Sequence, residues 1–466
     1  MRLNTGGTRS GQAKNARQPR QLYKLALAAV FLLTACGRSE TDRATEAAAN
    51  AANPGGLSLG REGLSRVIAS STGFAAVAAD ESRAAEIGRD ILLDGGNATD
   101  AAAAMYFAMA VTLPSAASIG SSGACIVHDD KTKAAEAFVF PPVAAPGPIA
   151  GQPFTVPASV RGIALMHVRH GVARWEQVVA PTERLARLGV PVSRALARDL
   201  QVGGGALLAD REAQRIFGKG GGMPTEGNLL VQRDLGAVLG AIRQRGGGDF
   251  FTGVTARAFS EQVAQAGGNL PVDALRSVVP QAGPPMTEDI GTFTRRRLYV
   301  APAPAAGAQA LAAWKGQPVT GTVPISSGGF AGVVAADSKA GAAACAFSMG
   351  QLFGAHVIVP GTGVLLAAPT PDAGSVSPVI VANPGNGEFN FAGAGGGGPT
   401  AAQAVGAVAR ATIEQDQKLA AVLQARGGQG GYVNAIACPS GLRGGADSCR
   451  SVIDPASPGG LALVAR

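Results

Sequence analysis

Between Pro324 and Gly354 the chain reads PISSGGFAGVVAADSKAGAAACAFSMGQLFG. Two apolar runs, residues 330–336 and 342–347, are separated by a short turn that contains Gly341. Apolar runs joined by so short a turn predict a β-hairpin. Neither run alternates between apolar and polar residues, so we expect both faces of the hairpin to be covered, as in a sheet that lies between two other layers.

Two small hydroxyl side chains, Ser326 and Ser327, stand just before the first predicted strand in a glycine-rich loop. A serine hydroxyl is a weak nucleophile that becomes reactive when a base lies beside it. A hydroxyl at the mouth of a buried hairpin is therefore a candidate nucleophile, provided that a base is freed next to it.

The serine pair, Asp337, Gly341 and the Phe353-Gly354 dipeptide follow one another in an order that resembles the gamma-glutamyltransferases. Members of this family are N-terminal-nucleophile hydrolases, which cut their own chain before a Thr or Ser that opens such a hairpin. The new α-amine then serves as the base for the hydroxyl of the same residue. The resemblance implies a self-cleaving amide hydrolase or acyltransferase.

The resemblance implies Ser326 as the nucleophile, with Ser327 as the second candidate. It also implies that Ser348, on the second strand, supports the nucleophile. One departure stands out, because counting back from Asp337 without a gap places Phe330 where the family has its nucleophile. The alternative is an uncleaved, catalytically inactive homologue that acts as a binding or scaffold protein of the cell envelope.

Two upstream stretches extend the resemblance, DGGNATDAA at 94–102 and VPASVRG at 156–162. The first predicts the joint between two helices, with Thr99-Asp100 able to cap the second. Both stretches resemble motifs of the large subunit of the family, and they identify the family without identifying its chemistry.

Downstream, the resemblance implies that Gly396 and Gly397 form an oxyanion hole, since amides of glycine can approach a substrate without obstruction by Cβ. It makes Asp372 and Ser375 candidate substrate contacts. The family also has an Arg that binds the α-carboxylate of the glutamyl group, but residues 138–146 contain no Arg. The substrate therefore lacks that carboxylate, another cation binds it, or the pocket is unused.

A missing carboxylate clamp makes glutathione a poor candidate substrate. A hydrolase of an apolar acyl amide, similar to cephalosporin acylases, would explain the missing Arg. The resemblance to the transferases leaves a small-molecule amide or γ-glutamyl compound as the expected substrate. Turnover of an amide without an α-carboxylate would distinguish these two types of enzyme.

The first residues are typical of a lipoprotein signal peptide. Six positive charges, at Arg2, Arg9, Lys14, Arg17, Arg20 and Lys24, precede a short apolar run at 25–33. The run is too short to span a bilayer and ends in Leu-Thr-Ala-Cys at 33–36, which resembles a lipobox with Cys36 as the lipidated residue. We expect a lipid anchor on the periplasmic side of the envelope, and Gly37 favours the outer membrane.

Removal of this segment takes six of the eight net positive charges away, because 8 − 6 = +2. The remaining chain is nearly neutral and has no cluster of Lys and Arg, which excludes nucleic acid as a partner. Its only expected membrane contact is the lipid anchor.

The expected organisation is a signal peptide at 1–35, a flexible tether at 36–60, a large-subunit-like segment at 61–325 and a small-subunit-like segment at 326–466. The tether is rich in small and polar residues and cannot build a core. The resemblance implies an α+β fold, a four-layer αββα sandwich of the N-terminal-nucleophile hydrolase type. Its two segments, cut from one precursor, are expected to associate.

Cys438 and Cys449 bracket a Pro- and Gly-rich loop, and a disulfide between them suits an oxidising compartment. Cys125 and Cys345 lie in apolar runs and are expected to be buried free thiols. We predict no cofactor and no metal: the glycine-rich stretches lack phosphate-binding spacing, and His167 and His170 have no further ligand at metal spacing. These two histidines are expected to be solvated.

Overall fold

The computed structural model describes residues 74–218, 220, 222–291, 295–321 and 326–465. They belong to one compact unit, Gly63–Arg466. The predicted signal peptide, the predicted tether and Cys36 lie outside the described residues. Within the described ranges, no helix has the length and apolarity needed to cross a bilayer.

Two antiparallel sheets form the centre of the fold. The seven-stranded sheet has the order β17 (Leu461–Ala465), β1 (Ala75–Ala79), β9 (Phe330–Ala336), β10 (Ala342–Ser348), β2 (Ser122–Asp129), β3 (Ala134–Phe140), β6 (Gln281–Gly283). The six-stranded sheet has the order β16 (Arg450–Ile453), β15 (Tyr432–Ala437), β14 (Glu388–Gly396), β13 (Val379–Asn383), β8 (Arg296–Val300), β7 (Met286–Ile290).

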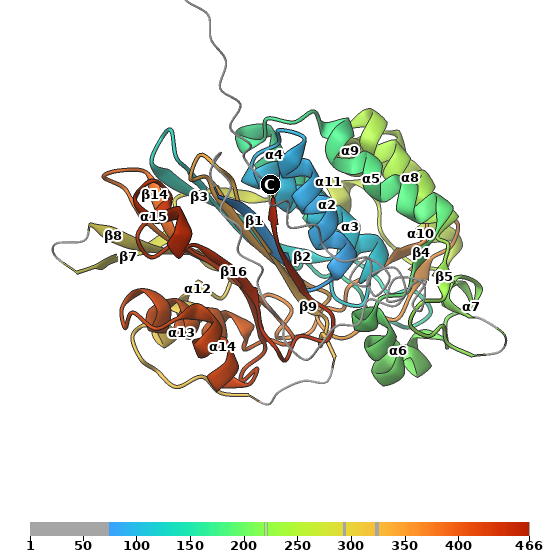
Figure 1. Cartoon of the computed structure of the whole chain (residues 1–466). Helices are drawn as coiled ribbons and strands as arrows, with labels where there is room; N and C mark the ends of the chain where they lie inside the picture. The colour runs from blue at the N-terminus through green and yellow to red at the C-terminus, as the bar shows by residue number, and fades with distance from the viewer. Residues whose placement is uncertain (1–73, 219, 221, 292–294, 322–325, 466) are drawn as a thin grey trace, which may run out of the picture. The chain divides into compact units, whose positions relative to one another are not determined.

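The sheets pack face to face, and helices cover their outer sides (Figure 1). Helices α2 (Ser82–Leu93) and α3 (Ala98–Thr112) lie on the seven-stranded sheet, and α12 (Gly307–Trp314) and α13 (Ala401–Ile413) lie on the six-stranded sheet. Between the sheets, Val334 of β9 packs in one core with Ile380 of β13 and Ile436 of β15. This arrangement confirms the predicted αββα sandwich.

The other elements surround these layers. Further helices are α4 (Ser159–His170), α5 (Trp175–Leu188), α6 (Arg194–Leu207), α7 (Arg211–Phe217), α8 (Arg233–Arg245), α9 (Asp249–Thr252), α10 (Val254–Gln265), α11 (Val272–Ser277), α14 (Leu419–Arg426), α15 (Leu442–Gly445) and the 3-10 turn η1 (Ala446–Ser448). Two short ladders join β4 (Val190–Pro191) with β5 (Leu229–Leu230) and β11 (Ile358–Val359) with β12 (Val364–Leu365).

The predicted hairpin is confirmed as β9 and β10, and both strands are buried along their whole length. Asp337 fixes the turn, because its Oδ1 accepts hydrogen bonds from the amides of Lys339 and Gly341. Its Oδ2 accepts a third hydrogen bond from the amide of Ala98, at the start of α3. One carboxylate therefore joins the hairpin turn to the helix that covers it.

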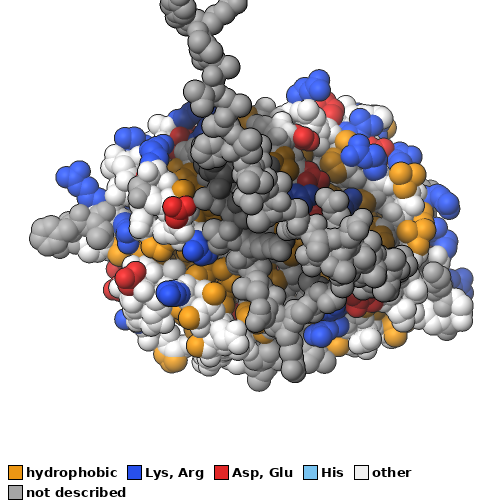
Figure 2. Space-filling view, viewed as in Figure 1, with side chains coloured by type: hydrophobic (Ala, Val, Ile, Leu, Met, Phe, Trp, Pro, Cys, Tyr) orange, Lys and Arg blue, Asp and Glu red, His pale blue; other side chains and the backbone are white. Residues whose placement is uncertain are grey.

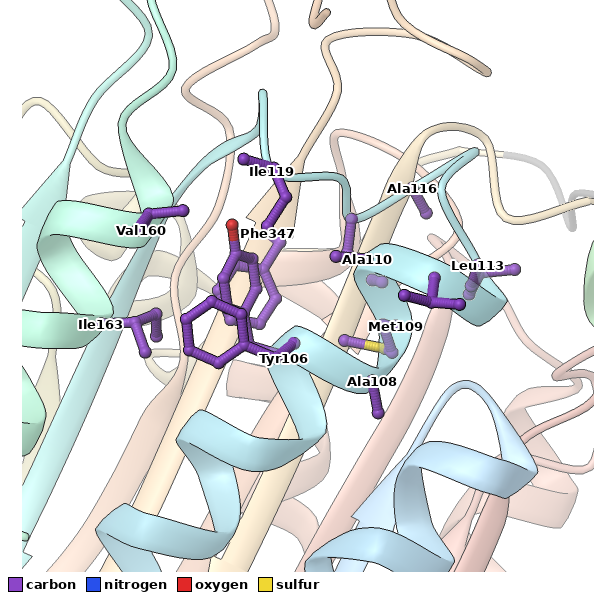
Figure 3. Close-up of a cluster of buried hydrophobic side chains, with 14 of the residues drawn as sticks. Tyr106, Ala108, Met109, Ala110, Leu113, Ala116, Ile119, Val160, Ile163 and Phe347 are labelled. Carbon is purple, nitrogen blue, oxygen red and sulfur yellow. The ribbon is translucent and has the colours of Figure 1, made fainter. Parts of the chain in front are cut away.

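Helix α3 is buried along its whole length. Asn97 caps it, so the predicted cap at Thr99-Asp100 was placed too late in the chain: both residues lie inside the first turn, where Asp100 completes a capping box with Asn97. Further along, the rings of Tyr106 and of Phe347 in β10 lie beside each other (Figure 3), with their centroids 4.8 Å apart. An apolar helix packed on an apolar strand explains why neither segment of sequence alternates.

The two predicted segments are not separate domains. Strands β1, β2, β3 and β6 of the first segment share a sheet with β9, β10 and β17 of the second, and β7 and β8 join β13–β16 in the other sheet. A cut before β9 would leave two fragments held together by continuous hydrogen-bonded ladders and one common core.

The expectation of free thiols at Cys125 and Cys345 is wrong. These residues lie opposite each other on the neighbouring strands β2 and β10, with their Cα atoms 4.1 Å apart, and form a disulfide. A second disulfide joins Cys438 to Cys449. The first pair is separated by 220 residues in sequence, so only the pairing of β2 with β10 brings it together.

On the face drawn in Figure 2, Lys and Arg side chains lie scattered around the rim, with a few Asp and Glu side chains among them. They form no single basic surface on that face.

Candidate active site

The serine pair lies in the turn that enters β9, as the sequence predicts. Ser326 and Ser327 are both buried, and the carbonyl of Ser327 accepts a hydrogen bond from the amide of Phe330 at 3.1 Å. The pair is thus held by backbone contacts at the head of the hairpin.

Asp199 of α6 binds Ser327 through both carboxylate oxygens. The amide of Ser327 donates to Oδ1 at 2.7 Å, and its hydroxyl donates to Oδ2 at 2.7 Å. The hydroxyl of Ser115, in the loop after α3, donates to the same Oδ2. Three donors therefore surround one buried carboxylate.

Burial raises the pKa of Asp199 to about 6, although the hydrogen bonds from Ser115 and Ser327 favour its ionised form. A carboxylate whose pKa lies close to neutral, at hydrogen-bond distance from a hydroxyl, has the properties of a general base. The arrangement can take the proton of the Ser327 hydroxyl.

The carbonyl of Ser326, which precedes Ser327 in the chain, has its own donor. The hydroxyl of Tyr432, in β15, donates to this oxygen at 2.8 Å. The pKa of Tyr432 is raised above its usual range, first by burial and then by the nearby negative charges of Asp80 and Asp199. The phenol therefore keeps its proton and polarises the carbonyl.

A second buried carboxyl, Asp80, follows β1. Its Oδ2 accepts the amide of Gly332 in β9 at 2.7 Å, while its Oδ1 has no hydrogen-bond partner among the described residues. Burial raises the pKa of Asp80 to about 7, and the hydrogen bond from the amide of Gly332 counteracts this rise in part. Asp80 thus changes charge close to neutral pH.

The predicted oxyanion glycines lie beside the serine turn. A Cβ on Gly396 would lie 2.3 Å from Asp80 Oδ2, so the strand tolerates only glycine there. The amide of Gly397 donates to the carbonyl of Phe330 at 3.1 Å, and a Cβ on Gly328 would lie 3.0 Å from the carbonyl oxygen of Gly397. The role of Gly396 and Gly397 as oxyanion donors stays a prediction.

Ser348 lies directly opposite Phe330 in the β9–β10 ladder. Its hydroxyl accepts the amide of Gly350 at 2.9 Å. Counting back from Asp337 without a gap also ended at Phe330, and the structure places this residue at the head of β9. The serine pair lies in the turn before the strand. Support of a nucleophile by Ser348 stays a prediction.

Asp372 and Ser375 lie in the loop between β12 and β13, and the amide of Ser375 donates to the carbonyl of Asp372 at 2.8 Å. Asp372 is exposed. Gly374 lies between Asp372 and Ser375 in the sequence and close to Pro142, since a Cβ added to it would lie 3.8 Å from the Pro142 ring. The loop thus approaches the segment without Arg, and its role in substrate binding stays a prediction.

The expectation that His167 and His170 are solvated is wrong. His167 is buried and lies 3.2 Å from Asp100, and His170 pairs with Glu136 at 2.7 Å. Helix α4 turns both rings toward neighbouring elements, which the sequence spacing alone did not reveal. Among the described residues, no group of three or more His, Cys, Asp or Glu side chains could hold a metal ion.

Sequence reasoning missed Asp199, Tyr432 and Asp80. Asp199 left one signal, since it falls on the apolar face of an amphipathic helix with Leu196 and Leu200, where a carboxylate is out of place. Asp80 likewise ends an apolar strand. Tyr432 left none, because its contact with Ser326 joins residues 106 positions apart.

The chain matches the family model described as gamma-glutamyltranspeptidase over residues 84–316, half of its length. This match ends before the serine pair. Glutathione hydrolase 3 of Arabidopsis thaliana is 28% identical over 264 residues, which are 54% of this chain and 40% of that protein. The glutathione hydrolase proenzyme of Escherichia coli K12 is 30% identical over 249 residues, 50% of this chain and 42% of the proenzyme.

The chain therefore spans about two fifths of the length of these curated relatives. Among solved structures, the cephalosporin acylase from Bacillus halodurans aligns with a TM-score of 0.69 and 18% identity, covering 89% of this chain and 98% of the acylase. This likeness concerns the fold alone.

The buried carboxyl of Asp80 gives a testable consequence for stability. In the unfolded chain its pKa lies near 3.8, and in the folded chain near 7. As the pH rises from about 4 to 7, the unfolded state loses this proton first, so the free energy of unfolding falls and then levels off. The replacement Asp80→Asn should therefore raise it by about 4 kcal/mol at pH 8 and change it little at pH 4.

Urea unfolding at both pH values measures this difference. The control is Asp94→Asn, which removes an exposed carboxylate just after α2. If Asp80→Asn raised the free energy of unfolding equally at both pH values, the raised pKa of Asp80 would be contradicted.

Proposed function

Because this chain belongs to the gamma-glutamyltranspeptidase family, we propose that it is a self-cleaving amide hydrolase or acyltransferase with a serine nucleophile. The observation that carries the proposal is the pair of hydrogen bonds at one peptide bond. Ser327 donates its hydroxyl to Asp199 at 2.7 Å, and the Ser326 carbonyl accepts one from Tyr432 at 2.8 Å. A hydroxyl beside a base and a polarised carbonyl are the groups that self-cleavage needs.

These contacts favour Ser327 over Ser326 as the nucleophile. The hydroxyl of Ser326 accepts a weak hydrogen bond from the amide of Gly328 at 3.3 Å, and no base among the described residues contacts it. Cleavage between the two serines would give Ser327 a free α-amine, which then serves as the base for its hydroxyl in turnover.

Cleavage would not separate the fragments. The strands of both segments alternate in the two sheets, and the disulfide between Cys125 and Cys345 joins a residue before the cut to one after it. The fragments would separate only after both reduction and unfolding.

For the substrate we propose an amide whose acyl group lacks an α-carboxylate. Residues 138–146 carry no Arg, and their Phe138 and Phe140 are buried. An unpaired carboxylate left in apolar surroundings would cost several kcal/mol. Glutathione hydrolysis, the activity named for the relatives, is therefore not the expected reaction.

One observation favours the second candidate function, an uncleaved homologue with a binding or scaffold role. Phe330 lies at the head of β9, opposite Ser348, where the family resemblance places the nucleophile. If the serine turn is inert, the chain keeps the fold without the chemistry.

The first prediction concerns the cut itself. The full chain, purified and reduced, should give two fragments on a denaturing gel, the second beginning at Ser327 by N-terminal sequencing. Without reduction it should run as one band, because the disulfide joins the fragments. Mass spectrometry of this species should give the mass of the intact chain plus one water. The replacement Ser327→Ala should abolish the cut, whereas Ser326→Ala should leave a cut at the same bond.

Thr412→Val is the matched control, because this buried hydroxyl in α13 has no hydrogen-bond partner among the described residues. A second fragment that begins at Ser326 would reassign the nucleophile. A single uncut chain under reducing conditions would refute self-cleavage and favour the uncleaved homologue.

The second prediction concerns specificity. The cleaved protein should hydrolyse an anilide of a simple aliphatic acid at least 10-fold more efficiently, in kcat/KM, than the γ-glutamyl anilide, because one uncompensated charge accounts for at least that ratio. Ser327→Ala serves as the blank. A preference for the γ-glutamyl anilide would show that another cation binds the α-carboxylate.

We also propose that the chain is a lipoprotein anchored through Cys36 on the periplasmic side, in the outer membrane. The lipobox pattern at 33–36 supports this. Cells grown with labelled palmitate should incorporate it into the parent chain and not into the Cys36→Ala variant. Equal labelling of both would refute the anchor.

A further inference from the structure

We propose that Asp199 is the proton-transferring residue of self-cleavage, and that Tyr432 is its carbonyl donor. This inference rests on the proposed function, because it assigns the groups that would carry out the cut between Ser326 and Ser327. Within the described residues, these two side chains contact all the polar atoms that would react.

The geometry of Asp199 suits a transfer between two atoms of one residue. Its Oδ2 accepts the hydroxyl of Ser327, and its Oδ1 accepts the amide of the same residue, each at 2.7 Å. During the cut, the hydroxyl oxygen of Ser327 must lose a proton and the amide nitrogen of Ser327 must gain one. A single carboxylate that contacts both can do both.

The reaction then proceeds in balanced steps. The carboxylate of Asp199 takes the hydroxyl proton of Ser327, and Oγ attacks the carbonyl carbon of Ser326. The carbonyl oxygen becomes an oxyanion, which accepts the hydrogen bond from Tyr432. When this intermediate collapses, the bond from carbon to the Ser327 nitrogen breaks, and Asp199 returns the proton to that nitrogen.

The product is an ester between the Ser326 carbonyl and the Ser327 oxygen, with a free α-amine on Ser327. Water then hydrolyses the ester to a carboxylate at Ser326 and a free hydroxyl at Ser327. The only co-reactant is water, and no oxidant or reductant takes part.

The surroundings of Asp199 keep it usable as a base. Ser115 stabilises its ionised form, and no ion pair to Asp199 is formed among the described residues that would hold the carboxylate permanently charged. Asp80, after β1, and Tyr432, in β15, are the other titratable groups near Asp199. The charges of Arg198 and Asp454 also act on the pKa of Tyr432.

These surroundings set the pH dependence. Burial raises the pKa of Asp199 to about 6, so the carboxylate is protonated below this pH and available above it. The rate of cleavage should therefore rise with pH through about 6 and then level off. Asp80, whose pKa lies near 7, ionises mainly above the midpoint of this rise.

The test follows the full chain after cell-free synthesis. Fresh precursor is transferred to buffers from pH 4.5 to pH 9, and reducing gels give the rate of cleavage. Asp199→Asn should slow the cut by roughly 100-fold or more, as loss of a general base does. Tyr432→Phe should slow it by a similar factor, as loss of an oxyanion donor does.

Glu81→Gln is the matched control, because this buried carboxylate contacts Ala84 and Thr112 and neither serine. Its cleavage rate should stay within a few-fold of the parent. Far-UV circular dichroism and thermal unfolding establish that each variant is folded.

Ser115→Ala keeps the inference testable even if Asp199→Asn does not fold. Loss of this donor destabilises ionised Asp199, so the midpoint of the pH profile should move upward by roughly one unit. A residue with only a structural role would lower the rate at every pH without moving the midpoint.

The outcomes separate the two proposals. A parent chain that never cleaves refutes the proposed function. A parent that cleaves, with Asp199→Asn cleaving at the same rate, refutes the role of Asp199 alone. A rate that keeps rising tenfold per pH unit up to pH 9 would also overturn it, since hydroxide rather than a carboxylate would then be the base.

Discussion

In the hairpin of β9 and β10, side chains point alternately toward α3 and toward the six-stranded sheet, and neither set reaches solvent. Val333 and Phe347 pack in the core with the helices, and Val334 and Ala344 pack between the sheets. Such a hairpin needs an apolar layer on each side, so the αββα order follows from its burial. The small residues allow a close approach: a Cβ on Gly332 would lie 2.9 Å from the backbone of Ala394 in β14.

The close approach of the sheets also confines the polar groups at the end of the hairpin. Ser327, Asp199 and Asp80 are buried there, and within the part of the chain that the structure describes Asp199 and Asp80 are stabilised by hydrogen bonds and not by ion pairs. Asp454 is also buried and pairs with Arg426, and burial nevertheless raises its pKa. Burial without a cation raises the pKa of Asp199 and of Asp80 toward neutrality, which destabilises the fold at higher pH but leaves both groups able to exchange protons.

The same packing explains how a cut chain could stay folded. A break in the serine turn removes one covalent bond at the entry to β9, while the ladders from β9 to β1 and β10 remain. The disulfide between Cys125 and Cys345 crosses this break. The new chain end would lie beside Asp199, where the free amine of Ser327 gains a negatively charged neighbour.

The sequence by itself determined the hairpin, the joint between α2 and α3 and the family, because these depend on local patterns. The apolar runs around Asp337 act over a few residues and can be recognised in order along the chain. The helix joint was recognised in the same way, although its cap was placed at Thr99-Asp100 and the structure has it at Asn97. The serine pair could be identified for the same reason, although its departure from the family pattern left two candidates for the nucleophile.

Only the tertiary structure decided which groups surround that pair. Asp199 lies 128 residues from Ser327 and Tyr432 lies 106 from Ser326, and the free-thiol expectation failed at Cys125 and Cys345 for the same reason. Contacts of this kind depend on the order of strands in a sheet and on the stacking of two sheets. Strand order and sheet stacking leave no local pattern in the sequence, because any buried strand of similar composition could pair with the same neighbour.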